Sequence, residues 1–173
     1  MGKVTFITGG SRSGKSIYAV ELAKKGNRGK TAFIATCGEI DKEMGQRIKL
    51  HRKARPGYWQ TFEEPLEVSS LLKKISNKFS VIVIDCLTLL VSNLMLKGRS
   101  GESVAKEVEK ILTTLEKARA VSIVVSNEVG MGIVPGNRLS RDFRDIAGRV
   151  NQIAAKHADS AFLMVSGIPW RIK

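Results

Sequence analysis

Short apolar runs of strand length alternate along this chain with segments of helical pattern, and this alternation limits the folds that the chain can adopt. The apolar runs are nearly continuous, which is typical of strands buried on both faces of a sheet. Strands that alternate with helices form a mostly parallel sheet with helices on both faces. We therefore expect an α/β fold in one domain over residues 1–173. The expected strands are 4–8, 31–36, 59–62, 80–85, 121–126, 161–165 and 169–172.

The segments between these runs predict helices, one of which follows Pro65, a residue suited to a first helical turn. The last two strands are separated only by the pair Ser166-Gly167, so we expect them to form an antiparallel hairpin at one edge of the sheet. The expected helices are 16–25, 39–54, 66–75, 86–97, 102–118 and 138–157.

A glycine-rich segment, Gly9-Gly10-Ser11-Arg12-Ser13-Gly14-Lys15-Ser16, follows the first expected strand and begins the first helix. It fits the phosphate-binding loop (P-loop) pattern of Gly, four residues, then Gly-Lys-Ser/Thr. Such a loop turns successive backbone N–H groups toward phosphate, and the helix N-terminus adds partial positive charge. Lys15 can reach the β and γ oxygens, and Ser16 can ligate Mg²⁺. A glycine-rich turn without a ligand is the alternative.

A carboxylate at the end of a nearby strand would complete such a site, and Asp85 closes the run Val81-Ile82-Val83-Ile84. This is the expected second magnesium ligand of a P-loop protein. The alternative is that Asp85 caps the 86–97 helix. Together with the P-loop, the metal role is favoured. P-loop folds include kinases, GTPases and ATP-driven motors, so these features leave the reaction open.

The basic segment around His51 is the second candidate site. If it is helical, Arg47, His51 and Arg55 share one face. Neighbouring cations disfavour the protonated imidazole and favour its neutral, nucleophilic form. The arginines could hold phosphate oxygens. A solvated basic helix, or one that docks on nucleic acid, remains the alternative. His157 is expected to be a surface or capping residue.

The net charge of +13 points to an anionic partner, but its distribution favours a local site. Residues 1–57 carry +9 of it and residues 138–173 carry +4. Aromatic residues make up 6%, which offers few stacking platforms for single-stranded nucleic acid. The chain has no apolar run of about 20 residues and no signal-peptide pattern. Its two cysteines suggest reduced thiols. We expect a cytoplasmic protein.

Several further motifs, with the P-loop, resemble the bifunctional adenosylcobinamide kinase/adenosylcobinamide-phosphate guanylyltransferase family, and the resemblance spans essentially the whole chain. The most specific is the run Asn127-Glu128-Val129-Gly130-Met131-Gly132-Ile133-Val134-Pro135. The others are Ile34-Ala35-Thr36, Arg47-Ile48, His51-Arg52, Arg55-Pro56, Trp59, Glu63-Glu64, residues 137–152 with Asp142-Phe143-Arg144-Asp145, and Val165-Ser166-Gly167-Ile168.

The resemblance implies a RecA-like P-loop NTPase fold and two reactions in cobalamin nucleotide loop assembly. ATP or GTP phosphorylates the aminopropanol hydroxyl of adenosylcobinamide. GMP is then transferred from GTP to that phosphate through a GMP-histidine intermediate, and pyrophosphate is released. It also implies Mg²⁺ and a homotrimer, with no nucleic acid partner and no membrane insertion. The alternatives are a monofunctional P-loop small-molecule kinase and a RecA-like nucleic-acid-dependent ATPase.

Site residues follow from the resemblance position by position, with His51 and Lys15 as the catalytic residues and Ser16 and Asp85 as the metal ligands. The nucleotide-binding residues are Gly9, Gly10, Ser11, Arg12, Ser13, Gly14, Lys15, Ser16, Ala35, Thr36, Cys37, Arg52, Lys53, Ala54, Arg55, Glu63 and Asp85.

Two further hypotheses concern the C-terminal part of the chain. Glu128 either faces the active site or belongs to a purely structural loop. The arginines of residues 138–149, offset by Asp142 and Asp145, are expected to form ion pairs within the helix or between subunits.

Overall fold

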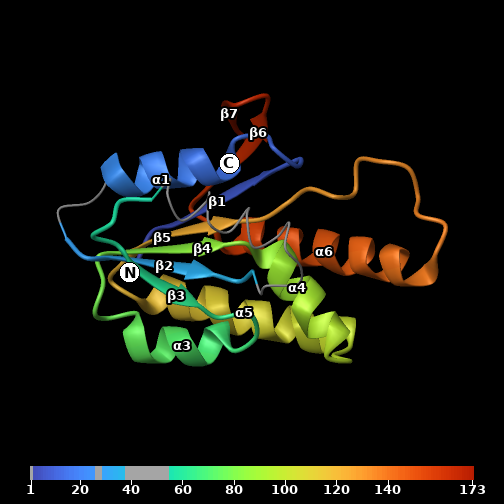
Figure 1. The fold of residues 1–173 in the computed structure, drawn as a ribbon, viewed down its shortest axis with the longest axis horizontal. Helices are drawn as coiled ribbons and strands as arrows, with labels where there is room; N and C mark the ends of the chain where they lie inside the picture. The colour runs from blue at the N-terminus through green and yellow to red at the C-terminus, as the bar shows by residue number, and fades with distance from the viewer. Residues whose placement is uncertain (1, 26–28, 38–54) are drawn as a thin grey trace.

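A single seven-stranded sheet forms the centre of the computed structural model, which describes residues 2–25, 29–37 and 55–173 (Figure 1). The strand order is β3-β2-β4-β5-β1-β6-β7. The strands are β1 (Val4–Gly9), β2 (Thr31–Ala35), β3 (Gln60–Glu63), β4 (Val81–Asp85), β5 (Val121–Val125), β6 (Ser160–Val165) and β7 (Ile168–Arg171).

Neighbouring strands from β3 to β6 pair in parallel, and only β7 runs antiparallel, to β6. The expected mostly parallel sheet and the C-terminal edge hairpin are thus confirmed. Ser166 and Gly167, both with positive φ, make the hairpin turn. The helix expected over residues 39–54 lies outside the described residues.

The other five expected helices are confirmed within one or two residues at their ends, and the largest difference is at α3. We expected that helix to begin at Leu66, directly after Pro65, but it begins at Val68. The Glu64 carboxylate accepts hydrogen bonds from the N–H groups of Leu66 and Glu67, at 3.0 and 2.8 Å, and this turn delays the helix. The helices are α1 (Lys15–Lys25), α3 (Val68–Ile75), α4 (Leu87–Leu96), α5 (Gly101–Lys117) and α6 (Arg138–His157).

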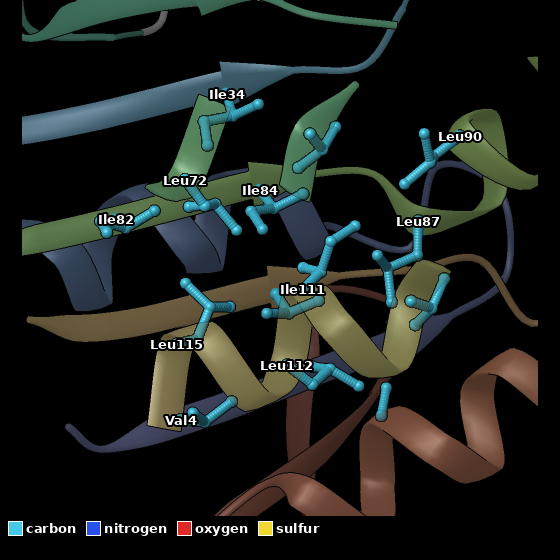
Figure 2. Close-up of a cluster of buried hydrophobic side chains, with 14 of the residues drawn as sticks. Val4, Ile34, Leu72, Ile82, Ile84, Leu87, Leu90, Ile111, Leu112 and Leu115 are labelled. Carbon is cyan, nitrogen blue, oxygen red and sulfur yellow. The ribbon is translucent and has the colours of Figure 1, made fainter. Parts of the chain in front are cut away.

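Successive side chains of a strand point to opposite faces of the sheet, and they pack into two separate hydrophobic clusters, one on each face. On β4, Ile82 and Ile84 enter the larger cluster, with residues of α3, α4, α5 and α6. Figure 2 shows these two side chains gathered with Ile111 and Leu112 of α5. Val81 and Val83 enter the smaller cluster, beneath α1. The face of the sheet to which a strand side chain points therefore determines which helices it contacts.

The six parallel strands end at the same edge of the sheet, and the loops that leave them there hold the candidate site residues. Ligands bind at this edge in open α/β sheets. Among the described residues, no helix is both long and apolar enough to cross a membrane.

Candidate nucleotide site

The P-loop leaves β1 and enters α1 through a tight turn that requires glycine at two positions. Gly9 has a φ of 149°, and a Cβ there would lie 2.5 Å from the Met164 carbonyl oxygen. Gly14 has a φ of 94°, and its Cβ would lie 3.2 Å from the Gly167 Cα. Ser11 and Arg12 are exposed at the loop, Ser13 is buried, and Ser16 is half-buried in the first turn of α1.

Lys15 is buried inside this loop. Its ammonium donates to the Gly10 carbonyl oxygen at 2.6 Å and lies 3.5 Å from the Ser13 hydroxyl. Burial lowers the pKa of Lys15, while the nearby Cys86 and Asp85 act in the opposite direction. The loop therefore holds a poorly solvated cation within electrostatic reach of a strand-end carboxylate.

The end of β4 is tied to the end of β2 by one threonine. Thr36 is fully buried, and its hydroxyl donates to the Cys86 carbonyl at 2.7 Å and accepts from the Cys86 N–H at 2.8 Å. The N-cap residue of α4 is Cys86, so the alternative reading of Asp85 as that cap is not supported. Asp85 pairs in register with Ala35, the last residue of β2.

The two cysteines flank this carboxylate, and neither forms a disulfide. Cys86 is buried, and burial with the nearby Asp85 raises its pKa to about 12. Cys37 is half-buried, and its pKa is raised by the same two causes. Both environments thus disfavour the reactive thiolate form.

The oxygen atoms near Lys15 fit a magnesium-nucleotide complex better than a site built only from protein. Mg²⁺ prefers oxygen ligands and is usually held by one or two protein groups plus substrate phosphates. Ser16 and Asp85 supply a hydroxyl and a carboxylate of this kind. In the part of the chain that the structure describes, no group of three or more His, Cys, Asp or Glu forms a metal site.

A second group of predicted residues lies at the β3 end of the sheet. The Arg55 guanidinium carbon is 3.5 Å from the centre of the Phe33 ring, and Phe33 stacks on the buried Trp59 with ring centres 6.5 Å apart. Glu63 ends β3, is exposed, and pairs in register with Ala35. Arg55 is thus anchored to β2 directly after the basic segment.

The structure therefore divides the predicted site residues into two groups. One group comprises the P-loop, Gly9 to Ser16, and Asp85 at the end of β4, with Ala35, Thr36 and Cys37 at the end of the neighbouring strand β2. Glu63 is four strand positions away from β1, or about 19 Å at ordinary strand spacing. His51, Arg52, Lys53 and Ala54, which would decide how the groups are joined, lie outside the described residues.

The hairpin turn between β6 and β7 supports the P-loop, a contact that we did not predict. The Gly167 N–H donates to the Ser13 carbonyl at 3.0 Å. The signal was present in the sequence as the Val165-Ser166-Gly167-Ile168 motif, but periodicity does not show which loop a distant turn will touch.

The loop after β5 also reaches the P-loop, through its backbone. The Glu128 N–H donates to the Gly9 carbonyl at 2.9 Å, whereas the Glu128 carboxylate accepts from the Gly130 N–H at 2.8 Å. The carboxylate thus closes its own turn, which supports the structural alternative for Glu128.

The arginines of α6 follow the expectation of ion pairs in part. Arg138 pairs with Asp142 at 3.6 Å and Arg144 with Asp145 at 3.8 Å. Arg141 instead donates to the Pro135 and Gly136 carbonyls. His157 pairs with Glu116 of α5 at 2.9 Å, in agreement with a structural role.

A parallel sheet whose first strand leads through a P-loop into a helix, with a strand-end aspartate beside the loop lysine, defines a P-loop NTPase fold. The sequence profile of the family described as CobU, cobinamide kinase / cobinamide phosphate guanyltransferase, matches residues 5–172. The chain belongs to this family.

The chain is similar to two bifunctional adenosylcobalamin biosynthesis proteins and, at lower identity, to a RecA protein. The bifunctional adenosylcobalamin biosynthesis protein CobU of Escherichia coli K12 is 38% identical over 96% of this chain and 98% of its own length. The corresponding protein CobP of Pseudomonas aeruginosa is 38% identical over 96% and 95%. The protein RecA of Oleidesulfovibrio alaskensis is 28% identical over 76% of this chain and 40% of its own length. The RecA similarity agrees with the fold.

Proposed function

We propose that residues 1–173 form one catalytic domain that phosphorylates adenosylcobinamide and then transfers GMP to the product. The observation that carries the proposal is the P-loop with its buried Lys15 next to Asp85, in a chain whose family is matched over residues 5–172. The single sheet from β1 to β7 supports one domain.

In the kinase step, ATP or GTP lies on the loop from Gly9 to Ser16. The aminopropanol hydroxyl oxygen forms a bond to the γ-phosphorus, the bond from that phosphorus to the bridging oxygen breaks, and the nucleoside diphosphate leaves. The hydroxyl proton passes to solvent. Lys15 and the loop N–H groups orient the phosphates and balance their charge. Ser16 and Asp85 would hold Mg²⁺, which neutralises phosphate charge when bound.

In the guanylyl step, a ring nitrogen of neutral His51 forms a bond to the α-phosphorus of GTP, and pyrophosphate leaves. The phosphate of adenosylcobinamide phosphate then attacks the same phosphorus, and the free histidine is restored. Arg52, Lys53, Ala54, Arg55 and Glu63 would contact the guanine nucleotide. The position of Arg55 against Phe33, at the end of the basic segment, supports this.

The protein would act as a homotrimer in the cytoplasm. Four apolar side chains between β5 and the first turn of α6 support an assembly, because they are strongly exposed and a monomer rarely shows a large apolar patch. They are Met131, Ile133, Val134 and Leu139.

The decisive test of the guanylyl step uses GTP labelled at the α-phosphate. Label should remain on the protein after denaturation and be lost in acid but not in base, as a histidine phosphoramidate requires. His51→Ala should abolish labelling. His157→Gln is the matched control, because it changes the other histidine and should label normally. Persistent labelling of His51→Ala would refute the assignment.

The same experiment separates the proposal from its alternatives. A monofunctional kinase would phosphorylate adenosylcobinamide without forming the labelled protein. A RecA-like nucleic-acid-dependent ATPase would hydrolyse ATP faster with DNA or RNA and would bind them with strong salt dependence.

A further inference from the structure

The pairing of β5 with β1 continues beyond the last residue of β5, and this continuation places Asn127. The Ser126 N–H donates to the Ile7 carbonyl and the Glu128 N–H to the Gly9 carbonyl, both at 2.9 Å. This is the two-residue repeat of a parallel ladder. The backbone through Asn127 therefore stays extended, and its side chains keep alternating between the two faces.

The alternation puts Asn127 on the face that carries the P-loop. Val125 enters the cluster beneath α1. The Ser126 hydroxyl turns to the other face, where it lies 2.9 Å from the Thr88 hydroxyl of α4. Asn127, one residue further, thus returns to the side of α1.

Asn127 completes a row of strand-end residues that leads to the loop. The neighbouring strands β2, β4 and β5 are followed or closed by Cys37, Asp85 and Asn127, and β1 with Gly9 comes next. Asp85 acts electrostatically on both Lys15 and Cys37, so its carboxylate lies within electrostatic reach of both side chains. By strand position, Asn127 stands between Asp85 and the P-loop.

The backbone at Asn127 is held from two helices. Its N–H donates to the Thr88 hydroxyl at 2.6 Å, and its carbonyl accepts from the Asn151 side-chain amide of α6 at 3.0 Å. Thr88 and Asn151 are themselves buried. Few positions in a loop are fixed on both sides by buried side chains, and such fixing keeps a side chain in one orientation.

We propose that the Asn127 side-chain amide donates a hydrogen bond to the transferring γ-phosphoryl group, and that Thr88 and Asn151 are positioning residues that hold it there. The inference rests on the proposed binding of the nucleotide at the P-loop. A neutral amide supplies a donor without adding another cation next to Lys15. A donor that meets the phosphoryl oxygens most strongly during transfer raises kcat more than nucleotide affinity.

The test compares Asn127→Ala and Asn127→Asp with the native protein, using adenosylcobinamide and ATP. Asn127→Ala should lower kcat of phosphorylation about 10²-fold, the usual effect of removing one such donor. Its affinity for ADP, which lacks the γ-phosphate, should stay unchanged. Asn127→Asp should bind ATP more weakly than Asn127→Ala does, because a carboxylate would face the γ-phosphate, while the two bind ADP alike.

Two variants of Thr88 test its role as a positioning residue. Thr88→Val removes the hydroxyl and should lower kcat with ADP affinity retained, and Thr88→Ser should restore kcat. Thr114→Val removes a hydroxyl of α5 that donates to the Lys110 carbonyl oxygen in an exposed hydrogen bond, and should leave kcat unchanged. A merely structural role would lower ADP affinity and kcat together in Thr88→Val.

Two outcomes separate failure of this inference from failure of the proposed function. If Lys15→Ala loses phosphorylation while Asn127→Ala retains the native kcat, the role of Asn127 is refuted and the P-loop assignment stands. If Lys15→Ala also retains phosphorylation, the nucleotide is not held by the P-loop, and both proposals fail.

Discussion

Lys15 combines two demands that usually conflict, because it must be cationic to bind phosphate and yet is buried in the loop. Burial lowers its pKa in the folded protein, whereas the unfolded chain keeps the ordinary value. The folded state therefore releases this proton at a lower pH than the unfolded state does. The lowered pKa of Lys15 therefore reduces the unfolding free energy at neutral pH. This reduction fades as the pH rises from the pKa of Lys15 in the folded protein to its pKa in the unfolded chain.

This sign gives a prediction for Lys15→Met, which has no titrating group at the position. The unfolding free energy of the native protein, relative to that of Lys15→Met, should increase as the pH is raised from 7 toward 10.5. Urea denaturation of both proteins across this range measures the difference. A relative stability that falls with pH would contradict the described environment of Lys15.

The two thiols should differ in reactivity because they differ in exposure. Cys86 is buried with a pKa of about 12, so iodoacetamide at pH 8 should modify it only after unfolding. Cys37 is half-buried, and its raised pKa should make modification slow but measurable in the native protein. Peptide mass analysis distinguishes the two sites. Equal rates of Cys86 modification in native and urea-treated protein would show that it is not enclosed.

Among the elements, the P-loop depends on β6 as much as on its own sequence. Gly9→Ala would place a Cβ against the Met164 carbonyl at a φ of 149°, and should lower the unfolding free energy by about 1–3 kcal/mol. At Gly10 a Cβ would meet nothing within 4 Å. Gly10→Ala is therefore the matched control and should unfold like the native protein. Equal stability of both variants in denaturant titrations would contradict the packing of the loop on β6.

Helix α6 begins at a side-chain cap that can be removed alone. The Asn137 side-chain oxygen accepts from the Ser140 N–H at 2.8 Å. Asn137→Ala should lower the unfolding free energy by about 1 kcal/mol, the usual effect of losing such a cap. Asn137→Asp keeps an acceptor and should stay near the native value. Equal denaturation midpoints for the Ala and Asp variants would show that the cap contributes nothing.

The elements themselves were predictable from local patterns, whereas contacts between distant loops were not. Apolar runs located every strand, and the glycine pattern located the P-loop. The start of α3 was missed because the Glu64 side chain accepts bonds that no periodicity reveals. Gly167 and Thr88 were missed as supports of the site for a similar reason, since their roles arise only when β6 and α4 are placed beside the loop. Asn127 begins the motif of residues 127–135. The face of the sheet on which its side chain lies, however, follows only from the pairing of β5 with β1.

At the scale of the whole molecule, the excess of positive charge acquires a local explanation. Of the net +13, +9 lies in residues 1–57, which include the P-loop and the basic segment that we propose to hold polyphosphate. The remaining +4 lies in residues 138–173, where Arg138 and Arg144 have acidic partners on the same helix.

The exposed apolar residues between β5 and α6 predict an assembly of several chains. A mass measurement gives the number of subunits in it. Light scattering coupled to size-exclusion chromatography should give a particle mass three times that of one chain. Ile133→Glu, which places a charge at a side chain that is 95% exposed, should shift the mass toward that of one chain without changing the thermal unfolding of the monomer. A native protein with the mass of a single chain at micromolar concentration would contradict the trimer.

The central claim is that one short chain catalyses both reactions. The most direct measurement supplies the purified protein with adenosylcobinamide, GTP and Mg²⁺, and follows the products by mass. We predict adenosylcobinamide phosphate first and adenosylcobinamide-GDP later, with pyrophosphate released. If adenosylcobinamide phosphate accumulates without adenosylcobinamide-GDP, the protein is only a kinase and the guanylyl step is refuted. If adenosylcobinamide stays unchanged, both reactions are refuted.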